Sequence, residues 1–297
     1  MNTAETPGAV VVGVDGSQAA LHAVRWAAVE AQSARCPVSL VHILEWPLVS
    51  FPVAGLQVDW TQQIHAEGHR WLQQAQETAE LAAPGVQTQA HLFTGDPREH
   101  LLTEAQHARE LVVGSRGLGG LRGMLLGSTS AAVTQHASCP VVVVHGNGDA
   151  AGPIVVGLDG SPASEQALGY AFKAASRAGA ALLAVHAWDD RGVRNPRRTQ
   201  AKELAVGEIE AAAQRMLAEQ LAGWPDEYPD VAVECRVIHQ RPAAALIDLG
   251  HRARMIVVGS RGRGGFARLL LGSVSQAVVQ HATCPVVICH RNPSSCA

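Results

Sequence analysis

Two glycine runs with the same spacing are the part of the sequence that most directly indicates chemistry. They read Gly114-x2-Gly117-x9-Gly127-Ser128 and Gly259-x2-Gly262-x9-Gly272-Ser273. Glycine lets the backbone turn sharply and approach a bound molecule without a Cβ atom in the way. Each run ends where a helix is expected to begin, and the free N–H groups and positive dipole end of a helix attract phosphate. One glycine after a strand usually serves only a turn, but the whole pattern occurs twice, which favours a ligand site.

The expected phosphate ligands are main-chain amides, hydroxyls and arginines. Both lysines of the chain lie outside the glycine runs, so the P-loop pattern GxxxxGK[ST] is absent. The hydroxyls of Ser128 and Ser273 can cap a helix or donate to a phosphate oxygen, and Thr129 and Val274 follow them with backbone amides. Candidate arginines lie in the turns and in the loops after them: Arg116, Arg122, Arg261, Arg263 and Arg268.

The elements that must position these loops occur in two copies. Residues 111–145 return as 256–290 with most positions identical. Self-similarity of this kind indicates two domains of one topology, and the turn-prone stretch 146–153 separates them. We therefore expect two domains, residues 1–148 and 149–297, each with one of the two glycine runs.

Each half alternates short β-branched runs with helical patterns. In the first half the expected strands are 9–14, 38–44, 86–93, 111–114 and 141–145, and the expected helices are 18–34, 60–83, 97–108 and 127–136. Strands that alternate with helices pair in parallel through right-handed crossovers. Nearly continuous valine runs indicate strands covered on both faces. Each half is therefore expected to be an α/β domain with a doubly wound open sheet and helices on both faces.

Ligands bind such sheets outside the carboxyl ends of the strands, where the strand order reverses. An aspartate and a helix-capping serine follow the first strand of each half, in Gly13-Val-Asp15-Gly-Ser17 and Gly157-Leu-Asp159-Gly-Ser161. This is not the GxGxxG dinucleotide fingerprint. The aspartate and the glycine run would face one crevice if the first and fourth strands are neighbours, which periodicity alone does not determine. His42 and His186, at the ends of the second strands, are expected either as core residues or as walls of the crevice.

These strings resemble the signature of the universal stress protein family. The resemblance rests on Val-Val-Gly-Ser-Arg-Gly, Leu-Leu-Gly-Ser and Cys-Pro-Val-Val in both halves and on the start Val-Gly-Val-Asp-Gly-Ser, and it covers essentially the whole chain. The spacing G-x2-G-x9-G-[ST] is the one that ATP-binding members share. The resemblance implies five parallel strands of order 3-2-1-4-5 in each half, ATP in the crevice, and a homodimer through the last strands, 141–144 and 286–288. The tandem layout is similar to that of actinobacterial stress and dormancy proteins.

Carried over by position, the resemblance implies a role for each site residue. Adenine and ribose would lie near Gly13, Asp15, Ile43 and Val113, and near Gly157, Asp159, Ala187 and Val258. The ribose–phosphate loop and the phosphate site would be formed by Gly114, Arg116, Gly117, Gly127, Ser128 and Thr129, and by Gly259, Arg261, Gly262, Gly272, Ser273 and Val274.

The pattern lacks catalytic parts. Hydrolysis of ATP needs a positioned base for water and usually a metal held by carboxylates. The motif loops contain no acid, and Asp15 and Asp159 are the only acids expected at their sites. We expect no catalytic residue and at most slow hydrolysis, with ATP, alone or with Mg²⁺, as a bound signal or structural plug. Two alternatives stay open: an adenine-nucleotide enzyme of the adenylyl-transfer or ATP-pyrophosphatase type, and a binder of AMP or a cyclic nucleotide.

Composition argues against several other classes. Among the 297 residues acids and bases are interspersed, with a net charge of −3, and no apolar run reaches membrane-span length, so neither a nucleic-acid nor a membrane surface is expected. The basic run 191–198 reads as a solvated linker. Six scattered cysteines without a CxxC pair and a start unlike a signal peptide favour reduced thiols and a cytoplasmic location, with Cys139 and Cys284 as buried small hydrophobes. His65 and His69 lack a third ligand, so no metal site is expected.

Overall fold

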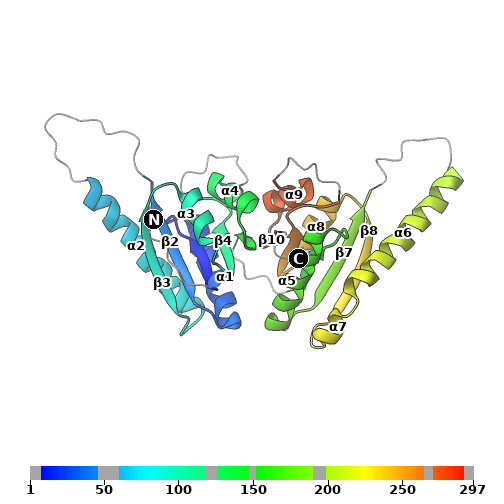
Figure 1. Cartoon of the computed structure of the whole chain (residues 1–297), viewed down its shortest axis with the longest axis horizontal. Helices are drawn as coiled ribbons and strands as arrows, with labels where there is room; N and C mark the ends of the chain where they lie inside the picture. The colour runs from blue at the N-terminus through cyan, green and yellow to red at the C-terminus, as the bar shows by residue number, and fades with distance from the viewer. Residues whose placement is uncertain are drawn as a thin grey trace. The chain divides into compact units, whose positions relative to one another are not determined.

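The structure is a computed structural model, and it describes residues 8–45, 60–117, 126–146, 152–189, 199–263 and 270–290. The chain forms two compact units, Met1–Gly148 and Asp149–Ala297, each built from parallel strands and helices (Figure 1). The basic run 191–198 and the residues Arg122, Arg268 and Cys296 lie outside the described residues.

Unit 1 is a doubly wound parallel sheet. Its strands are β1 (Val10–Gly13), β2 (Val38–Leu44), β3 (Thr88–Thr94), β4 (Glu110–Gly114) and β5 (Val141–Val144). Its helices are α1 (Gln18–Ala34), α2 (Trp60–Ala82), α3 (Pro97–Glu104) and α4 (Ser128–His136). The strands pair in parallel in the order β3-β2-β1-β4-β5. Helices α1 and α2 pack together and α3 packs on α4, as right-handed crossovers on opposite faces of the sheet require.

Unit 2 repeats this arrangement. Its strands are β6 (Ile154–Gly157), β7 (Leu182–Trp188), β8 (Val233–His239), β9 (Met255–Gly259) and β10 (Val286–Cys289). Its helices are α5 (Pro162–Ala178), α6 (Thr199–Leu221), α7 (Trp224–Glu227), α8 (Pro242–Gly250) and α9 (Ser273–His281). The parallel order is β8-β7-β6-β9-β10. The short helix α7, without a counterpart among the described elements of unit 1, stacks the Trp224 ring on Phe172 at 5.1 Å.

The fold follows from the apolar runs of the sequence. All four residues of β5 are buried, as are Val10, Val11 and Val12 of β1, because helices cover both faces of the sheet. Serine caps hold the helices that follow the first strands: the Ser17 hydroxyl accepts from the Ala20 amide at 3.1 Å, and the Ser161 hydroxyl accepts from the Ser164 amide at 3.2 Å. The expected fold class and capping serines are confirmed, and within each unit the strands pair in the expected order.

Several expected boundaries were wrong by a few residues. The helix expected over 97–108 ends at Glu104, because the Gln106 and His107 amides turn back to the carbonyls three residues earlier. The third strand is shifted toward its C-terminal end, to Thr88–Thr94 instead of 86–93. The helix expected from residue 127 begins at Ser128, with Gly127 as its N-cap. The strands expected over 9–14 and 141–145 are each shorter, at Val10–Gly13 and Val141–Val144.

Burial also bears out the expectation for two cysteines. The exposed fractions of Cys139 and Cys284 are 7% and 3%. Burial raises the pKa of the Cys139 thiol to about 12 and that of the Cys284 thiol to about 11. Both side chains therefore stay protonated at neutral pH and act as small apolar groups.

Candidate functional site

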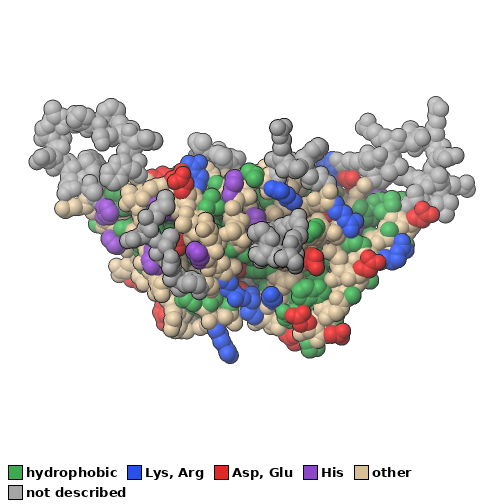
Figure 2. Space-filling model, in the orientation of Figure 1, with side chains coloured by type: hydrophobic (Ala, Val, Ile, Leu, Met, Phe, Trp, Pro, Cys, Tyr) green, Lys and Arg blue, Asp and Glu red, His purple; other side chains and the backbone are tan. Residues whose placement is uncertain are grey.

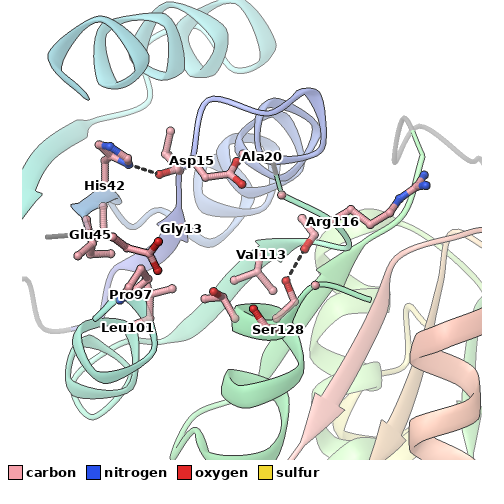
Figure 3. A pocket seen from close by; sticks show the side chains of 18 of the residues that line it. Gly13, Asp15, Ala20, His42, Glu45, Pro97, Leu101, Val113, Arg116 and Ser128 are labelled. Atoms are coloured by element: carbon pink, nitrogen blue, oxygen red, sulfur yellow. Dashed lines mark hydrogen bonds between the residues drawn. The ribbon is translucent and has the colours of Figure 1, made fainter. Parts of the chain in front are cut away.

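A cavity of about 640 Å³ opens in unit 1 where the carboxyl ends of β1, β2 and β4 meet (Figure 3). All ten candidate residues of the first half line it: Gly13, Asp15, Ile43, Val113, Gly114, Arg116, Gly117, Gly127, Ser128 and Thr129. Direct pairing of β1 with β4 brings them together, for example Val12 opposite Val112. The pairing shows that the first and fourth strands are neighbours, which periodicity alone did not determine.

A second cavity, of about 400 Å³, lies at the same place in unit 2. All ten candidate residues of the second half line it: Gly157, Asp159, Ala187, Val258, Gly259, Arg261, Gly262, Gly272, Ser273 and Val274. Here β6 pairs with β9, with Val156 opposite Val257. The structure therefore places each half's candidates in one cavity, and their nucleotide-binding roles stay predictions.

Both aspartates bond to the turn after the first strand, and Asp159 also joins that turn to the glycine loop. Asp15 Oδ1 accepts from the Ser17 amide at 3.0 Å. Asp159 Oδ1 accepts from the Ser161 amide at 3.0 Å, and its Oδ2 accepts from the Arg263 amide at 2.9 Å. In unit 2 the Asp159 carboxylate therefore holds two segments of the cavity wall together.

The glycines of the motif are glycine for different reasons. A Cβ atom on Gly114 would lie 2.7 Å from the backbone carbon of Ala19, so this glycine lets the end of β4 pack against α1. A Cβ atom on Gly117 would overlap Asp15 Oδ2. Gly259 and Gly262 repeat both situations in unit 2. Gly114 and Gly259 are therefore required by backbone packing, whereas Gly117 and Gly262 leave room for the aspartate carboxylates.

Gly127 and Gly272 are not required by packing. Gly127 has φ −69° and ψ 154°, which any residue adopts, and the nearest atom to an added Cβ would be the Gly117 nitrogen at 3.7 Å. At Gly272 the nearest atoms would lie at 3.4 Å, an ordinary contact. At both positions an added Cβ would make ordinary van der Waals contacts with the described backbone, so packing alone does not explain the glycine.

The same two glycines are the N-caps of α4 and α9, and neither helix has a side-chain hydrogen bond at its cap. The expected alternative, a cap from the Ser128 or Ser273 hydroxyl, is not observed, because these serines are the first helical residues. By contrast, Ser17 and Asp96 cap α1 and α3 with side-chain oxygens. The first turns of α4 and α9 therefore present their N–H groups to the cavities without a side-chain cap.

A second serine in each of these first turns was missed from sequence. The Ser130 hydroxyl donates to the Gly114 carbonyl at 2.7 Å, and the Ser275 hydroxyl donates to the Gly259 carbonyl at 2.6 Å. Both serines line their cavities and are buried. They fasten the helix start to the strand end, and the repeated Gly-Ser-x-Ser pattern was the signal that could have identified them.

His42 is both a core residue and a cavity wall. Its Nδ1 lies 2.7 Å from the Val14 carbonyl oxygen, so Nδ1 carries the proton, and its ring meets Trp71 edge to face at 5.0 Å. Burial lowers the pKa of His42, partly offset by the hydrogen bond to Val14 and by the charges of Asp15 and Glu67. His186 makes the matching contact with the Leu158 carbonyl at 2.8 Å.

The two candidate arginines in the turns line the cavities but are exposed. The side chain of Arg116 extends away from the other labelled residues in Figure 3. The Arg261 Nε donates to the Leu270 carbonyl at 3.4 Å. Arg116 therefore points away from the uncapped start of α4 at Ser128.

Glu45, Ile64 and Trp71 also line the first cavity and were not predicted. Figure 3 shows Glu45 and His42 across the cavity from Val113 and Ser128. The expectation that Asp15 would be the only acid at this site was wrong, because Glu45 directly follows β2, whose carboxyl end meets that of β1 at the same edge.

The described part of the chain lacks the features of a metal centre or a membrane span. There, no three His, Cys, Asp or Glu side chains form a group that could hold a metal ion. No described helix is long and apolar enough to cross a membrane. On the face shown in Figure 2, acidic and basic side chains are interspersed.

Comparison with known proteins agrees with this architecture. The family model described as the universal stress protein family matches residues 8–145 and 151–290. A universal stress protein of Mycolicibacterium smegmatis is 40% identical over 290 residues, which cover 94% of this chain and 96% of the relative. One of Mycobacterium tuberculosis H37Rv is 37% identical over 292 residues, covering 95% and 97%.

The fold is also shared with a solved structure. The crystal structure of a universal stress protein from Archaeoglobus fulgidus superposes with a TM-score of 0.67 at 20% identity, covering 96% of this chain and 99% of that chain. At this identity the likeness shows the fold alone. The family model and the mycobacterial relatives, which match both halves, show that the chain belongs to the universal stress protein family.

Proposed function

We propose that each unit binds one ATP molecule and that the chain acts as a nucleotide-dependent sensor or partner-binding module. The carrying observation is that Gly127 and Gly272, at helix starts without a side-chain cap, are glycines that neither their backbone conformation nor their packing requires. A folded chain has no packing reason to keep glycine there. A ligand that approaches the main chain closely supplies the reason.

The phosphate end of the ligand would lie at these helix starts. In unit 1 the amides of Ser128 and Thr129 line the cavity next to Gly127, and in unit 2 Ser273 and Val274 do so. A helix N-terminus offers N–H donors and a partial positive charge, which suit a phosphate group. Val274 in place of Thr129 favours main-chain contacts at this position over hydroxyl contacts.

The base would lie at the other end of each cavity, against apolar walls. Ile43, Leu101 and Val113 line this part of the first cavity, and Leu246 and Val258 line the second. The volumes of about 640 and 400 Å³ fall within the roughly 300–1,000 Å³ typical of small-molecule sites. Apolar walls with a few polar groups fit a purine nucleoside.

Binding without fast catalysis fits the side chains present. The acids that line the cavities among the described residues are Asp15, Glu45 and Asp159, and both aspartates already accept backbone N–H groups. A Mg²⁺ ion would therefore be held mainly by phosphate oxygens and water. We expect at most slow hydrolysis, well below the roughly 1 per second at the low end of ordinary enzymes.

A sensor role follows if nucleotide binding changes the surface that the chain shows to partners. The predicted homodimer would form through the last strands. Each of these strands, β5 and β10, pairs within its unit with the fourth strand, β4 or β9. Light scattering with and without nucleotide measures whether the chain forms this homodimer.

The direct test is the nucleotide itself. The purified chain is denatured, the released small molecules are separated by chromatography, and their amount per chain is measured. ATP supports the proposal, whereas AMP or a cyclic nucleotide as the bound species favours the alternative ligand. Turnover of ATP above about 1 per second would favour the enzyme alternative.

A further inference from the structure

The two cavities differ in the side chain that covers the Asp-Gly-Ser turn. In unit 1 the Trp71 ring from α2 covers Gly16, and a Cβ atom on that glycine would lie 2.5 Å from Trp71 Cε2. In unit 2 the Arg263 guanidinium covers Gly160, and a Cβ atom there would overlap its Nη2 and lie 2.7 Å from its Cζ. The side chain over this turn is therefore aromatic in the first cavity and cationic in the second.

Arg263 is anchored at the cavity by its backbone but not by its side chain. Its amide donates to Asp159 Oδ2 at 2.9 Å, and the residue lines the second cavity together with Gly272 and Ser273. The side chain is exposed, and within the described residues the guanidinium makes no hydrogen bond or ion pair. A flexible, exposed cation can leave Gly160 at little cost.

We propose that Arg263 makes the second site selective for the number of phosphates, so that it favours ATP over AMP more steeply than the first site does. A guanidinium pairs with phosphate oxygens through two parallel N–H donors. In the sequence of the first half the matching position holds Leu118, which lies outside the described residues. This inference rests on the proposed function.

The first cavity has a different means of selection. Its described lining includes the Trp71 and His42 rings, whereas no aromatic side chain lines the second cavity within the described part of unit 2. Rings recognise the base and are indifferent to the phosphate count. The ratio of ATP to AMP affinity is therefore expected to be smaller at the first site.

The test uses the full-length chain with its first site weakened by Gly127→Ala, a substitution that the backbone and packing at this position accept. Calorimetric titrations with ATP, ADP and AMP are compared between this chain and the same chain carrying R263L, which places the residue of the first half at this position. We expect R263L to weaken ATP binding about tenfold to a hundredfold and to change AMP binding less than about twofold. Raising the salt concentration should weaken ATP binding more in the parent chain than in R263L.

Two further variants show whether the effect is specific. R215L removes an equally exposed cation from α6, away from the cavity, and should leave both affinities unchanged. R263K keeps the charge but loses the planar fork, so it should retain part of the preference for ATP. Circular dichroism checks that each variant is folded.

The outcomes separate this inference from the proposed function. If the parent chain binds ATP and R263L leaves the ratio of ATP to AMP affinity unchanged, the selective role of Arg263 is refuted and nucleotide binding stands. If the folded parent chain binds neither nucleotide, both the inference and the proposed function of unit 2 are overturned.

Discussion

Replacing Gly127 by alanine tests whether this glycine is required for stability or for ligand binding. The backbone at Gly127 is extended, and an added Cβ would lie 3.7 Å from its nearest neighbour, so the folded chain accepts a methyl group there. The same methyl group would occupy the space beside the first turn of α4, where we place the phosphate. The variant should therefore keep its stability and lose its ligand.

The expected change in stability is small because two effects offset each other. Alanine restricts the unfolded chain more than glycine does, which stabilises by about 0.4–1 kcal/mol at a compatible position. Alanine is also a poorer N-cap than glycine, at a cost of about 0.5–1 kcal/mol. The free energy of unfolding of unit 1 should stay within about 1 kcal/mol of its original value, which corresponds to a Tm shift of no more than about 4 °C.

The expected change in binding is large. A methyl group that blocks charge-assisted hydrogen bonds from the main chain removes interactions worth about 1.5–3 kcal/mol, or about a tenfold to hundredfold loss of affinity. Isothermal titration with ATP measures this loss, and the site of unit 2 in the same chain provides an internal reference. We expect one of the two binding events to weaken and the other to remain.

Gly114→Ala is the matched contrast. Its Cβ would lie 2.7 Å from a backbone carbon of Ala19, which cannot move without shifting α1. Overpacking of this kind costs about 1–3 kcal/mol, so the Tm should fall by several degrees. If Gly127→Ala binds ATP like the original chain, or is destabilised as much as Gly114→Ala, the assignment of Gly127 to the ligand is wrong.

Three further outcomes are expected. Burial lowers the pKa of His42, so the unfolded chain binds more protons than folded unit 1 as the pH falls below about 6.5. Urea melts should therefore show that unit 1 loses stability from pH 7.5 to 5.5. The loss should be smaller in His42→Gln. Iodoacetamide at pH 8 should modify the exposed Cys235 well before Cys139 and Cys284, because burial raises the thiol pKa values of the latter two to about 12 and about 11. Peptide mass spectrometry measures the order of modification, and equal rates would contradict the prediction. Ser130→Ala removes a buried hydrogen bond to Gly114, so unit 1 should lose about 1–2 kcal/mol in the same melts, and an unchanged midpoint would contradict this.

Much of the fold could be predicted because the sequence repeats its own pattern. Continuous valine runs indicated strands covered on both faces, and the second strand, Val38–Leu44, was predicted to the residue. The strand order came from the family resemblance, since periodicity describes each strand alone and carries no information on its neighbours. The end of α3 was misplaced because the polar residues after Glu104 are compatible with both a helix and a turn.

The candidate site was predicted where the chain carries local signals. The glycine spacing and the residues that follow each strand predicted the motif positions that line both cavities. Trp71 and Glu45 were missed because they reach the first cavity through packing of α2 and the exit of β2, which no motif marks. The reasons for each glycine were also hidden in sequence, since only the packing shows that Gly114 is needed by the fold and Gly127 is not.

Native mass spectrometry of the intact chain, titrated with ATP, tests the central claim most directly, because it counts bound molecules on each chain. We expect adducts of one and then two ATP, with a single adduct remaining at equal concentration for Gly127→Ala. A chain that carries no adenine nucleotide even at millimolar ATP would contradict the assignment of both cavities.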